Sequence, residues 1–164
     1  MDEFIIVERM EKCVTLTLWV KILLTSEEPG WNVPKLDVSI ITKDRPQSLA
    51  RLLSSLSKAI FFSDTLNLRV NLEQSSDADT LQMIDNFTWE HGSMFVHHRV
   101  VHGGLLPAVV ESWYPHSNDT YGLLLEDDVE LSPLFYAWVK MSVLRYRCVL
   151  RNEVFHIFIS FPRL

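Results

Sequence analysis

Three consecutive acidic residues, Glu126, Asp127 and Asp128, directly follow the apolar run Tyr-Gly-Leu-Leu-Leu at residues 121–125. Carboxylates this close together repel one another unless water or a cation neutralises them. Mg²⁺ and Mn²⁺ are suitable cations because they prefer oxygen ligands. Such a cation would also hold phosphate oxygens of a nucleotide diphosphate and stabilise the charge of a phosphate leaving group. We therefore predict a metal and diphosphate site at these acids.

The same acids have a second interpretation, in which they only interact with the positive end of the following helix. Ser132 and Pro133 would then cap that helix. An acidic triplet taken alone favours this second interpretation. The apolar strand before the triplet and the polar residues after the other predicted strands favour a binding site.

The rest of the sequence predicts an alternation of strands and helices that would position these acids. Short apolar or β-branched runs predict the strands, and helical spacing of apolar residues predicts the helices. This alternation predicts an α/β fold with a mostly parallel sheet and helices on both faces. The predicted strands are residues 36–42, 66–72, 95–101 and 121–125, and the predicted helices are 47–62, a segment containing 81–87, 105–113 and 133–146.

Polar residues follow each predicted strand, at the edge of a parallel sheet where ligands bind. Lys43 and Arg45 offer positive donors for a diphosphate, although a solvated turn explains them equally well. Glu73 fits either a ligand contact or a surface acid. Ser75 or Asp77 would cap the second helix, and Gly103-Gly104 favours a turn. After the first three strands these residues are Thr42, Lys43 and Arg45, then Glu73 and Asp77, then residues 102–104.

Composition excludes some classes of function. The chain has 164 residues, of which 48% are hydrophobic and 22% charged, which is typical of one globular domain. Its net charge of −6 argues against a partner nucleic acid.

His97 and His98 would point to opposite faces of a strand, which argues against a shared zinc ion. A phosphate-loop motif is absent, and Lys43 to Pro46 lacks the glycines that nucleotidyltransferases often have there.

Four segments carry a resemblance to a known family. They are VSIIT-KDRP, LRVNLEQSSDADT, GGL and YGLLLEDDVELSP. Together they resemble the GT-A glycosyltransferases grouped as family 2-like, and the acidic stretch is similar to that of the N-acetylglucosaminyltransferase I group. The resemblance covers about residues 36–147. It implies a Rossmann-like nucleotide-diphospho-sugar transferase fold and transfer of a sugar from a nucleotide-diphosphate sugar to an acceptor hydroxyl.

The resemblance also implies roles for single residues. Thr42, Lys43 and Arg45 would lie against the nucleotide, and Glu73 would face its base or ribose. Ser76 and Asp77 resemble the S-T-D loop of the family. Residues 126–128 stand in place of its D-x-D motif, so Glu126 and Asp127 would contact the nucleotide sugar, and Asp128, with Asp127, would bind the metal. The implied cofactor is Mn²⁺ or Mg²⁺, and the implied donor is a UDP- or GDP-sugar.

The sequence departs from the family pattern after the acidic triplet. Family members have a later acceptor half, and inverting members need a base there to deprotonate the acceptor hydroxyl. Beyond Asp128 the only acids are Glu130 and Glu153, neither of which is an obvious base, so no catalytic base is assigned. We therefore divide the chain into an extension and linker (1–35), a nucleotide-sugar-binding domain (36–147) and an atypical tail (148–164).

Two functions follow from this departure. The first is a glycosyltransferase, and the alternative is a truncated, inactive module that binds a nucleotide sugar or a partner chain. The expectation is a donor site with an incomplete acceptor site. The family commonly works at Golgi or other membranes, but the sequence shows no signal peptide or membrane anchor, so the compartment stays open.

Overall fold

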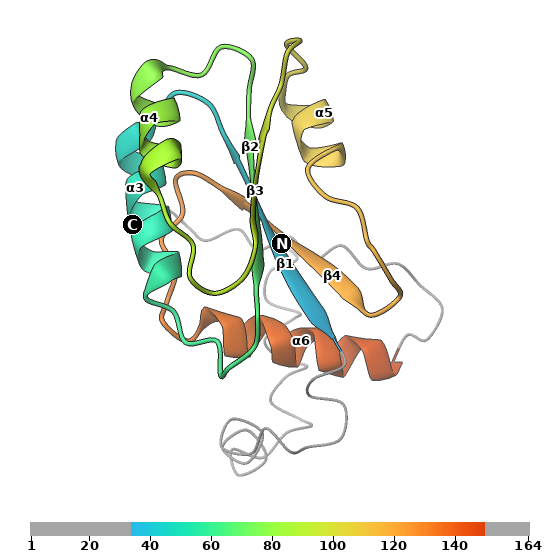
Figure 1. Ribbon diagram of the computed structural model, residues 1–164. Coiled ribbons are helices and arrows are strands. Elements are labelled where there is room, and N and C mark those ends of the chain that lie inside the picture. The colour runs from blue at the N-terminus through green and yellow to red at the C-terminus, as the bar shows by residue number, and fades with distance from the viewer. Residues whose placement is uncertain (1–33, 150–164) are drawn as a thin grey trace, which may run out of the picture. The chain divides into compact units, whose positions relative to one another are not determined.

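The computed structural model describes residues 34–149, which lie in the second of two compact units of the chain, Val33–Leu164. Of the predicted extension and linker (1–35) and the predicted tail (148–164), residues 1–33 and 150–164 lie outside the described residues. Figure 1 shows the described part as a sheet with helices around it. None of the helices in this part is long and apolar enough to cross a membrane.

Strands and helices alternate along the chain as the sequence predicts. Helix α4 (Ala78–Asn86) has one of the two predicted caps, because Asp77 Oδ1 accepts a hydrogen bond from Thr80 N. The elements are β1 (Lys35–Thr42), α3 (Pro46–Ser57), β2 (Asn67–Leu72), α4 (Ala78–Asn86), β3 (Met94–His98), α5 (Leu105–Val110), β4 (Thr120–Glu126) and α6 (Phe135–Val149).

Three predicted elements are too long. The helix predicted for 47–62 ends at Ser57, because the chain then turns through Phe62 and Ser63, which both have positive φ. This turn buries Phe61 in the core but leaves Ile60 exposed. The strand predicted for 95–101 ends at His98 and the helix predicted for 105–113 ends at Val110. The residues beyond these ends lie in loops. The sequence predicted regular structure for them only because of their apolar residues.

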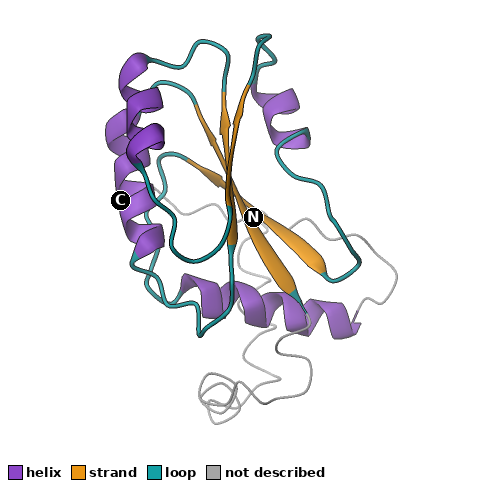
Figure 2. Ribbon diagram, viewed as in Figure 1, coloured by secondary structure: helices purple, strands orange, loops and turns teal. Residues whose placement is uncertain are grey.

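The sheet has four parallel strands in the order β3-β2-β1-β4. At its centre Ile40 of β1 lies between Val70 of β2 and Leu125 of β4. Parallel pairing requires crossover connections, which the helices provide. The predicted α/β class with a Rossmann-like parallel sheet is therefore confirmed, and Figure 2 shows how the helices flank the strands.

One face of the sheet carries the apolar core. Alternate side chains of a strand point to the same face, so Leu36, Val38 and Ile40 of β1 pack together on this side. Helices α3, α4 and α6 contribute further apolar residues to the cluster. These include Leu49, Leu52, Leu53 and Leu56 of α3, Ile84 of α4, and Phe135, Tyr136, Val139 and Val143 of α6.

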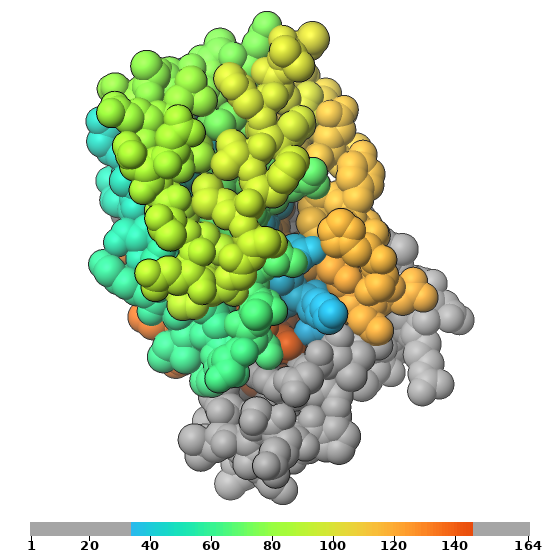
Figure 3. Space-filling view, in the orientation of Figure 1, coloured from blue at the N-terminus to red at the C-terminus, as the bar shows by residue number. Residues whose placement is uncertain are grey.

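The opposite face of the sheet is polar, and α5 lies on this side (Figure 1). Ser39 Oγ donates to the carbonyl oxygen of Ser112 at 2.9 Å, and Trp113 Nε1 donates to Asp37 Oδ2 at 3.0 Å. A side chain at Gly122 would collide with Trp113, because its Cβ would lie 2.5 Å from the indole Cδ2. The segment after α5 is thus anchored to the sheet by polar contacts. Part of β1 stays visible between β3 and this segment in Figure 3.

Candidate functional site

The carboxyl ends of β1, β2 and β4 meet at one edge of the sheet and border a cavity of about 270 Å³. Residues at the ends of β1 and β4 form one wall, and Glu73 after β2 forms the other wall with the loop into α5. Of the predicted site residues, Asp77 and Asp128 are not among those that line it. The lining residues are Ile41, Thr42, Lys43, Arg45, Glu73, His102, Gly104, Leu105, Ala108, Glu126 and Asp127.

Asp127 is the most buried acid of this edge, with a side chain that is 2% exposed. It lies in the turn that ends β4, and Thr42 Oγ1 at the end of neighbouring β1 donates to its Oδ2 at 2.8 Å. Burial raises the pKa of Asp127, while the Thr42 hydrogen bond and the nearby Arg45 charge oppose this rise. A carboxylate in this position requires a positive partner to stay ionised.

Arg45 provides that positive charge for two carboxylates. Its Nη2 lies 3.0 Å from Asp127 Oδ1, and its Nη1 donates to Asp128 Oδ2 at 3.3 Å. The contact with Asp127 Oδ1 is an ion pair, and that buried oxygen has no hydrogen bond to any of the described residues. The guanidinium itself is half exposed and faces the cavity. This edge of the sheet therefore combines buried negative charge with the accessible positive charge of the Arg45 side chain.

The three consecutive acids do not act as one cluster. Glu126 is exposed on the cavity wall, whereas Asp127 points toward Thr42 and Arg45. Within residues 34–149, no three His, Cys, Asp or Glu side chains converge as a metal site. Two carboxylates do suffice for Mg²⁺ or Mn²⁺ when substrate phosphates and water supply the other oxygens. The buried Asp127 oxygen without a hydrogen bond, beside Asp128, fits such a cation.

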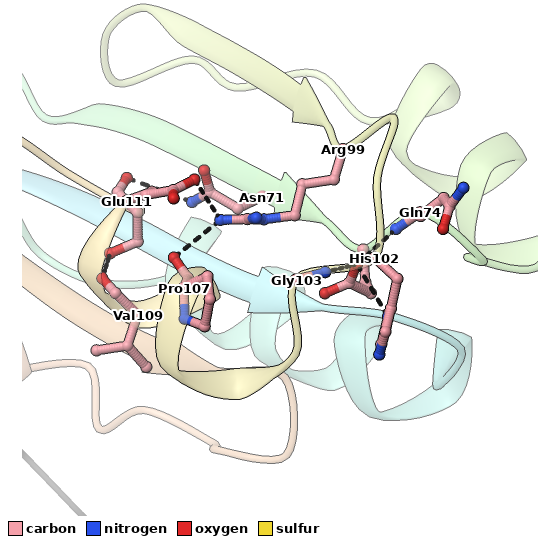
Figure 4. A network of polar contacts seen from close by, with 10 residues as sticks. Asn71, Gln74, Arg99, His102, Gly103, Pro107, Val109 and Glu111 are labelled. Atoms are coloured by element: carbon pink, nitrogen blue, oxygen red, sulfur yellow. Dashed lines mark hydrogen bonds and ion pairs between the residues drawn. The ribbon is translucent and has the colours of Figure 1, made fainter.

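Glu73 holds the opposite wall of the cavity in place. Its Oε1 accepts hydrogen bonds from Gln74 N at 3.0 Å and Gly103 N at 3.3 Å, and His102 Nδ1 lies 3.4 Å away (Figure 4). The Gln74 bond is the main cause that lowers the pKa of Glu73, and burial opposes it. The sequence left Glu73 as either a ligand contact or a surface acid, and the structure also makes it an anchor of the loop before α5.

A second anchor fixes the far end of that loop. Arg99 Nη2 donates to the carbonyl oxygen of Pro107 at 2.8 Å and to Glu111 Oε2 at 2.7 Å (Figure 4). Gly103 allows this approach, because a Cβ there would lie 2.4 Å from Arg99 Nη1. Gly104 has a φ of 73°, which glycine adopts without steric cost. The two glycines thus serve as the predicted turn and also let the loop pack closely.

The other predicted site residues have different surroundings. Lys43 lines the cavity and pairs with exposed Asp44 at 3.8 Å. The carboxylate of Asp77 caps α4, so its role toward a nucleotide stays a prediction. Sequence reasoning missed Ile41, Leu105 and Ala108, which carry no polar signal, and it placed His102 at a strand end without assigning it a role in nucleotide binding.

Comparisons with known proteins agree with this fold. The family profile described as the SPBC1E8.03c C-terminal domain matches residues 47–161. A search of curated proteins finds no match. Structures of S. aureus TarS, a glycosyltransferase with a GT-A-like fold, are similar to the chain.

The similarity to TarS concerns the fold. The structure of TarS 1–349 matches with a TM-score of 0.55 and 17% identity, over 69% of this chain and 33% of that one. The same fragment in complex with UDP gives 0.54 and 18% over the same shares. Another TarS structure gives 0.54 and 16%, over 69% of this chain and 20% of that chain. The chain thus spans about a third or less of the length of these relatives.

Proposed function

The chain belongs to the family of the SPBC1E8.03c C-terminal domain and has a glycosyltransferase-like fold, and from these findings we propose that it binds a nucleotide-diphosphate sugar. The observation that carries the proposal is the charged edge of the cavity. There, buried Asp127 and neighbouring Asp128 share the guanidinium of Arg45 at the carboxyl ends of parallel strands. Ligands of parallel α/β sheets bind at such ends.

The diphosphate is the part of the donor that this edge would recognise. Arg45 and Lys43 both line the cavity, and their charges suit phosphate oxygens. Asp127 and Asp128 would hold Mn²⁺ or Mg²⁺, which when bound neutralises charge on the diphosphate leaving group. Thr42 keeps Asp127 oriented through its hydrogen bond. Metal dependence and the binding of a UDP- or GDP-sugar are parts of this proposal.

The nucleoside would lie against the other wall. Glu73 lines the cavity there, together with exposed His102 and the backbone at Gly104. We assign base or ribose contacts to this wall, as the resemblance to family 2-like enzymes implies. UDP is the first candidate, because one similar TarS structure is a complex with UDP. The location at Golgi or other endomembranes that this resemblance implies stays part of the proposal.

Transfer of the sugar to an acceptor hydroxyl is the enzymatic form of this function. It requires a group that accepts the proton of the acceptor as the hydroxyl attacks the anomeric carbon. Among described residues after Asp128, the only carboxylate is that of exposed Glu130. This observation favours the second candidate function, in which residues 36–147 bind the donor and do not transfer its sugar.

Calorimetric titration with UDP and with GDP, in the presence and absence of Mn²⁺, tests the proposed donor site. Wild type is compared with Asp128→Ala and with Asp44→Ala, a control that removes an exposed acid close to the same edge. The proposal expects Mn²⁺-dependent binding of one nucleotide that Asp128→Ala weakens and Asp44→Ala preserves. A folded wild-type chain that binds neither nucleotide would refute the proposal.

A separate assay distinguishes transfer from binding alone. The chain is incubated with the UDP- or GDP-sugar whose nucleotide binds, and release of the nucleoside diphosphate is followed with and without a mixture of hydroxyl acceptors. Release above the level of Asp127→Asn indicates an enzyme. Binding of the donor without such release supports the second candidate function.

A further inference from the structure

Arg45 holds two carboxylates that differ greatly in accessibility. The side chain of Asp127 is 2% exposed, whereas that of Asp128 is 26% exposed. One guanidinium nitrogen lies near each of them, at 3.0 and 3.3 Å. The guanidinium thus sits between the two acids that the proposed function assigns to a divalent cation.

The partners of this ion pair also differ in their freedom to move. Asp127 is buried in the turn after β4 and fixed by the hydrogen bond from Thr42. The side chain of Arg45 is 50% exposed, and it is a long side chain at the N-terminus of α3, before Pro46. A change of partner would therefore move Arg45 and leave the carboxylate of Asp127 in place.

We propose that Arg45 is an exchangeable counterion, which neutralises Asp127 and Asp128 until a divalent cation replaces it and then binds the diphosphate. This inference rests on the proposed function of the same site. A buried carboxylate is costly without a positive partner, so the ligand-free protein needs a cation of its own. Asp127 Oδ1 has no hydrogen bond within residues 34–149 and only an ion pair with Arg45, so a divalent cation could take the place of that contact.

The exchange would couple the two ligands. Once displaced, the guanidinium still belongs to the cavity wall beside Lys43, where its planar fork can bind two phosphate oxygens. Cation binding therefore prepares the site for the diphosphate. By thermodynamic reciprocity, the diphosphate must raise the affinity for the cation by the same factor. Arg45 thus weakens cation binding alone but strengthens binding of the nucleotide.

The test is the substitution Arg45→Gln, measured against two ligands. Mn²⁺ binding without nucleotide is followed by electron paramagnetic resonance, and UDP or GDP binding with saturating Mn²⁺ by calorimetry. Loss of a competing charge about 3 Å from the acids should tighten Mn²⁺ binding, on the order of 10-fold. Loss of the phosphate donor should weaken nucleotide binding, also on the order of 10-fold. The inference therefore predicts effects of opposite sign from one substitution.

Arg51→Gln is the matched control, because Arg51 is exposed on α3 and donates only to the Ser48 hydroxyl among the hydrogen bonds found in the described residues. It removes the same charge and should leave both affinities within about two-fold of wild type. Arg45→Lys keeps the positive charge but lacks the planar guanidinium that can donate to two phosphate oxygens. It should leave Mn²⁺ binding near wild type while weakening nucleotide binding. If Arg45→Gln does not fold, Arg45→Lys replaces it as the test variant, and the weaker nucleotide binding remains the expected result.

The outcomes separate this inference from the proposed function. Nucleotide binding in wild type, with Mn²⁺ binding that is unchanged or weaker in Arg45→Gln, overturns the exchange and leaves the donor site standing. Nucleotide binding that needs no Mn²⁺ overturns the exchange and the metal dependence of the proposed function, and leaves only nucleotide binding at this site standing. Absence of nucleotide binding in folded wild type overturns the proposed function and the exchange together.

Discussion

Two regions of the molecule place a carboxylate beside a cation, and they do so differently. At the carboxyl ends of the strands, Asp127 is buried, while its partner Arg45 is half exposed. In the second region, Lys140 of α6 is 2% exposed and donates to Asp64 Oδ2 at 2.7 Å. Tyr136 donates to the same oxygen at 2.6 Å, and burial followed by this bond raises the pKa of Tyr136.

The difference lies in which groups can change partner. Asp64, Tyr136 and Lys140 form a set of hydrogen bonds and an ion pair that joins α6 to the loop before β2. At the strand ends, one buried oxygen of Asp127 lacks a hydrogen bond and the cation faces a cavity. The first arrangement suits a structural connection and the second suits a binding site. The following predictions test this contrast, in order of decreasing effect.

Lys140→Met should destabilise the protein most. It leaves Asp64 without its buried cation, and removal of one partner of a buried ion pair costs about 3–5 kcal/mol. The free energy of unfolding in urea is the measurement. Lys43→Met is the control, because exposed Lys43 pairs with Asp44 at 3.8 Å and should contribute less than about 1 kcal/mol. Equal losses in both variants would remove the contrast between the regions.

Asp127→Asn should abolish metal-dependent nucleotide binding, with a loss of about 100-fold or more, without loss of stability. Burial disfavours the ionised form of Asp127 and raises its pKa, so a neutral amide of the same size should leave the free energy of unfolding unchanged or increase it. Calorimetry and urea unfolding measure the two effects. A variant that binds normally, or one that is destabilised like Lys140→Met, contradicts the assignment.

Glu73→Gln should cost about 1–2 kcal/mol at neutral pH, because a neutral amide oxygen accepts the backbone hydrogen bonds from Gln74 and Gly103 more weakly than the carboxylate does. The pKa of Glu73 is lowered from 4.5, so its stabilising contribution is present above pH 4.5 and is lost as the pH falls through the folded value. Unfolding curves of wild type and variant should therefore converge in acid. A difference that persists well below pH 4.5 would show that the charge of Glu73 is not the cause.

Asp77→Ala should have the smallest effect. Loss of the cap of α4 costs about 1 kcal/mol, measured by urea unfolding. Asp79→Ala, in the first turn of the same helix, is the control and should cost less. Because Asp77 does not line the cavity, we expect nucleotide affinity to stay within about two-fold of wild type. A larger loss of affinity would restore the direct role that the sequence suggested for Asp77.

The sequence predicted the sheet well because each strand is a short apolar run with a polar end. Its errors occur where an apolar residue serves a loop. Phe61 continues the helical spacing of α3, yet it enters the core from a turn with positive φ at Phe62 and Ser63. Val100 and Val101 read as a continuation of β3, but they are exposed in the loop before α5. The sequence around such residues does not indicate what they contact in the folded protein.

The candidate site was predictable in its position and less so in its contacts. Thr42, Arg45 and Asp127 follow strands, and parallel pairing of β1 with β4 brings those strand ends together. The sequence could not show that Arg45 bridges Asp127 and Asp128, because that contact spans 83 residues. Nor could it show that Glu73 holds Gly103, which depends on the path of the loop after β3.

Paramagnetic broadening by Mn²⁺ tests the central claim most directly. Backbone amide spectra of wild type are recorded with UDP or GDP before and after addition of substoichiometric Mn²⁺. The account predicts that broadening centres on Thr42, Asp127 and Asp128 and spares the amides of Asp64, Tyr136 and Lys140. Broadening centred elsewhere, or none that depends on the nucleotide, would contradict a metal-dependent donor site at the carboxyl ends of the strands.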